Sequence, residues 1–174
     1  MDFIAQRREP SGVYVPRRAI ATPLLIQRAQ DSFSMTSLST MERTTHSAIV
    51  DDRNEHIEIW INGEFFARHE AKISVFDSGF LVGDGVWEGI RLHKGKFAFL
   101  NRHLDRLYAG AAAIDLDIGL SRDELSTALN TTVERNSMRD GVHVRLMVTR
   151  GNKTTPSQHP SNCAGGPNIV IIAE

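Results

Sequence analysis

Apolar and polar residues alternate along the chain over positions 57–61, and this run ends at Asn62-Gly63. Strict alternation is typical of a β-strand with one buried face, and Asn-Gly is a strong signal for a two-residue hairpin turn. Two phenylalanines follow at positions 65 and 66. The pattern therefore predicts a strand, a tight turn and a return strand, with a further short strand over 73–76.

A second hairpin and a helix are predicted next. Apolar and polar positions alternate from Trp87 to His93, Lys94-Gly95 supplies a turn, and a return strand is expected over 96–100. From about residue 102 to 114, apolar side chains recur at spacings of three and four, which predicts an amphipathic helix.

The remaining chain predicts one more helix and two strands. Ser121-x-x-Glu124 is a capping box, which marks a helix N-terminus. An apolar strand is expected over 142–149, a polar loop over 151–167 and a last strand over 168–173. Strands, two helices and strands in this order, joined by tight hairpins, predict an α+β fold. In it, two helices pack on one face of a mostly antiparallel sheet.

Residues 1–55 show no sustained apolar period. They carry paired arginines, three prolines and a Ser/Thr-rich run, so we expect a flexible N-terminal extension, with one domain over 56–174. An organelle transit peptide is the alternative, because such leaders are rich in Arg and Ser. Acidic residues and the prolines count against it.

Composition narrows the function classes. A net charge of -1 and a pI near 6.7 argue against nucleic-acid binding, and no apolar run approaches the ~20 residues needed to span a membrane. Cys163 is the only cysteine, so no internal disulfide can form and a reducing, cytoplasmic location is expected. The seven histidines contain no tight ligand motif, so no metal site is expected.

Candidate binding residues lie on the strand from Trp87 to His93. Trp87, Gly89 and Arg91 share one face, and this combination of ring, bare backbone and guanidinium would suit a flat ligand. A sheet edge with a glycine bulge is the alternative. The glycines around Asp84 could cradle a phosphate, but a plain tight connection is the alternative because a strand follows them.

Two further arginines are candidates. Arg106 lies beside the apolar stripe of its helix, where its guanidinium can reach a phosphate while its stem stays packed. The alternative is a surface pair with a carboxylate such as Asp105 or Asp115. Arg145 lies in an apolar strand, where a charge needs a partner, either an anionic ligand or an internal salt bridge with Glu88.

Four motifs carry a family resemblance, and they occur in this order: Trp60-Ile61-Asn62-Gly63, Gly83-Asp84-Gly85-Val86-Trp87-Glu88-Gly89-Ile90-Arg91, His103-Leu104-Asp105-Arg106-Leu107 and Val148-Thr149-Arg150-Gly151. Each is weak alone. Together they make residues 59–174 resemble the N-terminal small domain of the class IV, fold-type IV pyridoxal-phosphate (PLP) enzymes. That family includes branched-chain aminotransferases, D-amino-acid aminotransferases and aminodeoxychorismate lyase.

The resemblance implies a PLP-dependent aminotransferase that moves an amino group between an amino acid and a 2-oxo acid. It implies that Arg106 binds the cofactor phosphate and that Trp87 and Arg145 lie on the substrate side. The D-amino-acid enzymes carry an Arg-x-His pair after the Arg-Gly turn, and its absence from residues 154–159 favours a branched-chain donor. Family relatives are homodimers, so a homodimer is expected.

PLP chemistry also requires a lysine that forms a Schiff base with the cofactor. None of Lys72, Lys94, Lys96 and Lys153 matches it, because the family places that lysine in a large domain, beyond Glu174 here. We therefore expect no catalytic residue in this chain and a truncated N-terminal part that is inactive alone. The alternatives are a PLP lyase of the same fold, a D-amino-acid aminotransferase, and a non-catalytic dimerisation or binding module.

Overall fold

The computed structural model of the protein describes residues 51–174. Within these residues, no helix is both long and apolar enough to cross a membrane. The helices and strands follow one another in this order: η1 (Asp52–Asn54), β1 (Glu58–Ile61), β2 (Glu64–Ala67), α1 (Ser78–Val82), β3 (Gly85–His93), β4 (Lys96–Phe97), α2 (Leu100–Ala113), α3 (Arg122–Arg135), β5 (Val142–Thr149), β6 (Asn152–Lys153), η2 (Pro160–Asn162), β7 (Cys163–Ala164) and β8 (Asn168–Ala173).

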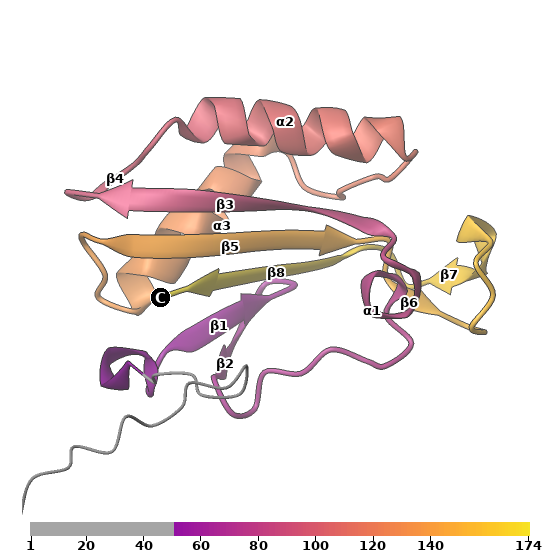
Figure 1. Cartoon of the computed structure of the whole chain (residues 1–174), viewed down its shortest axis with the longest axis horizontal. Helices are drawn as coiled ribbons and strands as arrows, with labels where there is room; N and C mark the ends of the chain where they lie inside the picture. The colour runs from indigo at the N-terminus through magenta and orange to yellow at the C-terminus, as the bar shows by residue number, and fades with distance from the viewer. Residues whose placement is uncertain (1–50) are drawn as a thin grey trace, which may run out of the picture. The chain divides into compact units, whose positions relative to one another are not determined.

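Six strands form one antiparallel sheet in the order β2-β1-β8-β5-β3-β4, and β6 and β7 pair separately. Helix α2 runs alongside β3, and α3 crosses behind the sheet, where it contacts β1 and β8 (Figure 1). The predicted α+β fold, with a mostly antiparallel sheet and helices on one side, is confirmed.

The two faces of the sheet differ sharply in burial. Along β5, Val142, Val144, Leu146 and Val148 are buried against the helices, while the residues between them are only half-buried. Burying one such side chain contributes about 1.5–3 kcal/mol. The core therefore lies between the sheet and the helices, and the opposite face is open.

The predicted turns and helix cap are present. The backbone φ angles are 50° and 99° at Asn62 and Gly63, and 47° and 74° at Lys94 and Gly95. Positive φ at both central residues matches the twist of a two-residue hairpin. At Ser121, the hydroxyl accepts the amide three residues later and the reciprocal bond completes the capping box. Such a cap stabilises a helix by about 1 kcal/mol.

Three local predictions are wrong. The segment 151–167, expected to be a polar loop throughout, contains the paired short strands β6 and β7 and the short helix η2. Residues 73–76 form an exposed loop, not a strand, because the chain turns there into α1, whose first amides are capped by Asp77. The return strand predicted over 96–100 is limited to β4, since α2 begins at Leu100. The extension predicted for residues 1–55 lies outside the described residues, except for positions 51–55.

Candidate active site

Strand β3 places candidate side chains on both sides of the sheet. Trp87 and Arg91 are exposed on the open face, whereas Glu88, Ile90 and Leu92 are buried on the helix side. This division follows the two-residue period predicted from the sequence. Two separate groups of polar residues therefore form around this one strand.

The group on the helix side, the Glu88 cluster, consists of Glu88, His103 and Arg106. The carboxylate of Glu88 is only 1% exposed, and Arg106 donates from Nε and Nη2 to its two oxygens, at 2.6 Å each. Nδ1 of His103 lies 2.8 Å from Oε2. His103 and Arg106 reach the same carboxylate because residues three apart on a helix are neighbours on its surface.

The Glu88 cluster favours an ionised carboxylate. The pKa of Glu88 lies below its usual value, first because Arg106 donates hydrogen bonds to it. Burial works against this lowering, and the hydrogen bond with His103 supports it. The same pairing raises the pKa of Arg106. The Arg106 side chain is nevertheless 73% exposed, and its Nη1 has no hydrogen-bond partner among residues 51–174.

These contacts correct two alternatives suggested by the sequence. Arg106 pairs with Glu88 and not with Asp105, which instead pairs with Arg122 at 2.6 Å. The suggested salt bridge between Glu88 and Arg145 is also wrong, because their side chains lie on opposite faces of the sheet.

The open-face group contains Trp87, Arg145 and His143. Arg145 lies opposite Gly89 in the β3–β5 register, and its Cζ is 4.3 Å from the centroid of the Trp87 ring. Such a cation–π contact contributes about 0.5–1 kcal/mol at an exposed site. Within residues 51–174, no carboxylate forms a salt bridge with Arg145.

The glycine in this strand makes room for both basic side chains. A Cβ added at Gly89 would lie 3.0 Å from Nε2 of His143 and 4.0 Å from Nη1 of Arg145. The absence of a side chain therefore lets an imidazole and a guanidinium lie directly over the strand. The predicted face of aromatic ring, bare backbone and guanidinium exists, but Arg145 is the guanidinium that contacts the ring.

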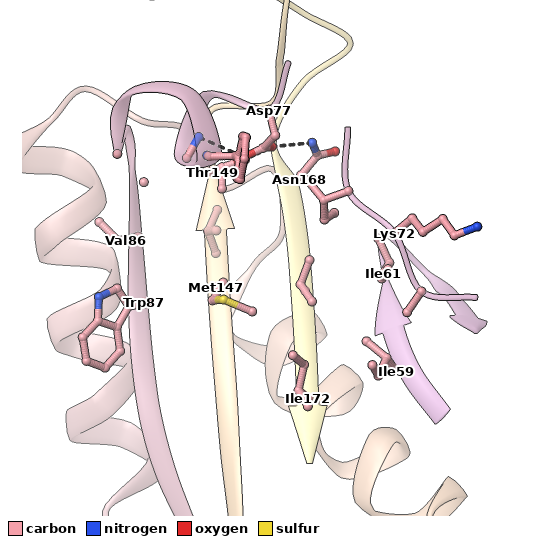
Figure 2. Close-up of a pocket in the computed structure, with 18 residues that line it drawn as sticks. Ile59, Ile61, Lys72, Asp77, Val86, Trp87, Met147, Thr149, Asn168 and Ile172 are labelled. Atoms are coloured by element: carbon pink, nitrogen blue, oxygen red, sulfur yellow. Dashed lines mark hydrogen bonds between the residues drawn. The ribbon is translucent and has the colours of Figure 1, made fainter. Parts of the chain in front are cut away.

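An apolar pocket of about 570 Å³ lies on the open face beside Trp87. Figure 2 shows Trp87 at its β3 side and Ile59 and Ile61 at its β1 side. Aliphatic side chains also line the middle of the pocket, among them Met147, Val170 and Ile172. Such a lining suits an aliphatic ligand group.

A polar network borders the pocket at its α1 end. Asp77, 1% exposed, accepts hydrogen bonds from Thr149 Oγ1 at 2.6 Å and Asn168 Nδ2 at 2.7 Å (Figure 2). The amides of Gly79 and Phe80 also donate to it. Four donors satisfy this carboxylate, so it anchors α1 to the sheet.

Arg150 joins the glycine turn to the end of α2. It donates from Nε to Asp84 Oδ2 at 2.7 Å, and from its terminal nitrogens to the carbonyls of Ile114 and Asp115 at 2.7 and 2.6 Å. A cation is favourable at a helix C-terminus. Asp115, whose carboxylate was suggested as a partner for Arg106, contacts Arg150 through its backbone carbonyl, while Arg106 pairs with Glu88.

The four lysines take no part in either group. Lys72 borders the pocket, but its side chain points away from it (Figure 2). Lys94 and Lys96 belong to the exposed β3–β4 hairpin. Lys153 is buried, and its Nζ donates to the carbonyl of His159 at 3.2 Å.

Sequence reasoning found Trp87, Arg145 and Arg106 but not the partner of Arg106. The structure brings Trp87 and Arg145 together and places Arg106 on the other side of β3. Glu88 and His103 were missed as its neighbours. A signal existed, because Glu88 falls on the same strand face as buried aliphatic residues, where a carboxylate needs a cationic partner.

A family model described as "Amino-transferase class IV" matches residues 85–173. The chain belongs to this family. The match runs from the start of β3 to the end of β8 and includes both groups described above, so the resemblance stated from the four motifs is confirmed.

Two curated relatives and one solved structure illustrate the similarity. The chain is 40% identical over 121 residues to branched-chain-amino-acid aminotransferase-like protein 1 of Arabidopsis thaliana, which covers 70% of this chain and 22% of that protein. It is 40% identical over 109 residues to a D-alanine aminotransferase of Listeria monocytogenes, and this match covers 60% of this chain and 37% of that protein. The branched-chain aminotransferase of the thermophilic archaeon Thermoproteus uzoniensis, solved with norvaline, superposes with a TM-score of 0.58 at 27% identity, covering 68% and 40%. The chain thus spans less than half the length of these proteins.

Proposed function

We propose that this domain belongs to a PLP-dependent aminotransferase that moves an amino group between a branched-chain amino acid and a 2-oxo acid. Family membership supports the reaction class. The observation that carries the proposal for this chain is the guanidinium of Arg106, which a buried carboxylate holds on one edge while the side chain is exposed.

The described residues fit a phosphorylated cofactor. A guanidinium binds phosphate through paired N–H donors, and Arg106 has donors that Glu88 leaves unused. Arg106 would therefore hold the phosphate of PLP. When bound, PLP supplies the electron sink that allows an amino group to leave one carbon skeleton and join another.

Trp87 and Arg145 would form the substrate side. Arg145 lies on an aromatic ring with no carboxylate partner among residues 51–174, so its guanidinium is available to a substrate carboxylate. Trp87 also lines the apolar pocket, which would receive an aliphatic side chain. A carboxylate site next to an aliphatic pocket supports a branched-chain donor.

We assign no covalent or proton-transfer role to the four lysines, since none is hydrogen-bonded to either group and Lys153 is buried with a carbonyl partner. The contribution of these residues is binding and orientation: Arg106 holds a phosphate, Arg145 a carboxylate, and Trp87 shields one side of the substrate from water. We infer that the domain alone does not catalyse transfer.

A D-amino-acid donor is the second candidate, because the identity to the D-alanine aminotransferase equals that to the Arabidopsis relative. A PLP lyase of the same fold would use the same phosphate contact. A non-catalytic module would bind no phosphorylated pyridine at Arg106.

A homodimer is also part of the proposal. Large apolar side chains that line the pocket are exposed, among them Ile73, Phe80 and Trp87, and such patches often mark interfaces. Sedimentation that shows a monomer at all concentrations would contradict this. The single cysteine supports a reducing, cytoplasmic location.

The function is tested with a chimera in which residues 56–174 replace the matching segment of the Thermoproteus uzoniensis enzyme. We expect transfer from L-leucine to 2-oxoglutarate, followed as glutamate formed, and loss of cofactor retention in Arg106→Ala. Transfer from D-alanine but not L-leucine would favour the second candidate. A folded chimera whose cofactor retention does not depend on Arg106 would refute the phosphate role.

A further inference from the structure

We propose that Glu88 is a positioning residue for cofactor binding: it fixes the Nε–Nη2 edge of the Arg106 guanidinium so that the Nη1–Nη2 edge is presented to a phosphate. This inference rests on the phosphate role proposed for Arg106 and adds to it a second residue, from a different element, on which that role depends.

The hydrogen-bond pattern carries the inference. A guanidinium has five N–H donors in a rigid plane. Glu88 takes the Nε donor and one Nη2 donor, which together form one edge of the group. The edge shared by Nη1 and Nη2 remains, and a bidentate phosphate contact needs two parallel donors of this kind. The carboxylate therefore selects the edge that stays free.

Burial makes Glu88 a fixed reference point. Its side chain is 1% exposed while that of Arg106 is 73% exposed, so the carboxylate cannot follow the arginine into solvent. His103 contacts Oε2 from the same helix as Arg106, which restrains the carboxylate further. An exposed arginine without this contact would sample many rotamers, and binding a phosphate would have to order it.

Positioning and simple electrostatics predict opposite results. Removing a negative charge next to Arg106 raises the local positive potential, which by itself strengthens binding of an anion. Removing a positioning contact weakens binding, because the guanidinium must then be ordered by the ligand. Whether the affinity for phosphate falls or rises when the Glu88 charge is removed therefore separates a positioning role from a purely electrostatic one.

The experiment measures binding of pyridoxine 5'-phosphate and of pyridoxine to the full 174-residue chain by calorimetry. Pyridoxine 5'-phosphate is used because it lacks the aldehyde that would react with lysines. The variant is Glu88→Gln, and the matched control is Asp105→Asn. Asp105 is next to Arg106 in the sequence, but its carboxylate pairs with Arg122 and not with Arg106. We expect Glu88→Gln to weaken the phosphate-dependent binding about fivefold or more, and Asp105→Asn to leave it unchanged or stronger.

A double-mutant cycle shows whether Glu88 acts through Arg106. In an Arg106→Gln background, Glu88→Gln should have no further effect on phosphate-dependent binding. Equal weakening in both backgrounds would overturn the inference, since Glu88 would then act independently of Arg106. Unchanged or tighter binding in Glu88→Gln alone would overturn it as well.

If Glu88→Gln does not fold, the positioning role of Glu88 can still be tested on the wild-type chain. In ¹⁵N NMR, the Nε–Hε signal of Arg106 should show the downfield shift and slow solvent exchange of a carboxylate-bound guanidinium, and should keep them when inorganic phosphate is added. A signal typical of a free arginine, or one that phosphate releases from Glu88, would overturn the inference. Phosphate-dependent binding that is unchanged in Arg106→Gln would instead refute the phosphate role in the proposed function, so the two failures are distinguishable.

Discussion

Arg106 and Arg145 lie on opposite faces of the same sheet and are held in opposite ways. Arg106 is fixed by a buried carboxylate through two hydrogen bonds of 2.6 Å. Arg145 lies 4.3 Å from an aromatic ring centroid, without a carboxylate among the described residues. The hydrogen bonds from Glu88 fix the orientation of the Arg106 guanidinium, whereas the Trp87 ring stacks against the Arg145 guanidinium without accepting a hydrogen bond from it. For the ligands proposed above, Arg106 would offer a phosphate donors in a fixed orientation, and Arg145 would offer a carboxylate an unpaired guanidinium.

The largest expected effect is on stability, and it comes from truncating a side chain on the helix side of the sheet rather than on the open face. Leu146→Ala removes a fully buried side chain from the helix side and should lower the free energy of unfolding by about 3 kcal/mol. Met147→Ala, one residue further on the open face, should change it by less than about 1 kcal/mol. Urea denaturation measures both. Equal losses would mean that the open face is packed as tightly as the core.

An exchange of lysine for each arginine should separate the two binding roles. Arg106→Lys should weaken pyridoxine 5'-phosphate binding about tenfold, because an ammonium lacks the paired donors, and leave binding of 4-methyl-2-oxopentanoate unchanged. Arg145→Lys should weaken binding of 4-methyl-2-oxopentanoate and leave binding of pyridoxine 5'-phosphate unchanged. Calorimetry on both variants checks this, and a variant that weakens binding of both ligands equally would contradict this division of roles.

The pH dependence of stability should also distinguish the two sides. The pKa of Glu88 is lowered in the folded state, so its contribution is present above its unfolded pKa of about 4.3 and is lost as pH falls through the lower folded value. The stability difference between wild type and Glu88→Gln should therefore shrink over this acidic range. Arg145→Met removes no carboxylate contact, so its stability difference from wild type should stay constant over the same acidic range, measured by thermal unfolding.

Gly89→Ala should have the smallest effect on stability. The added Cβ would press on Nε2 of His143 at 3.0 Å, but alanine also restricts the unfolded chain, and the two effects should offset to within about 0.5 kcal/mol. We expect weaker binding of 4-methyl-2-oxopentanoate because His143 and Arg145 are displaced. Unchanged affinity would show that the bare backbone is not needed on this face.

Sequence patterns predicted what depends on local chemistry. The turn at Asn62-Gly63 and the cap at Ser121 require particular residue types, and both were found as expected. The helix α1 was not predicted, because its five residues are too few to show a helical period. The strand expected over 73–76 was wrong, because local strand preference does not say whether a neighbouring edge is available.

The candidate site shows the same limit. Alternation along β3 correctly separated Trp87 from Glu88, since a period of two fixes the face of each residue. It could not show that α2 places Arg106 and His103 over Glu88, because the position of a helix along a strand depends on how the whole core packs. Family resemblance supplied the roles of single residues, and only the structure supplied their contacts.

The position of β8 has a consequence for how the molecule is made. Among the described strands, this last one alone links the β1–β2 hairpin to the group of β3, β4 and β5 within the sheet. Its Ile169 amide donates to the side chain of Asn62, 107 positions earlier. Contacts so distant in sequence slow folding, because a long loop must be closed first. During translation the two parts of the sheet would therefore stay unpaired with each other until β8 is synthesised and hydrogen-bonds to both.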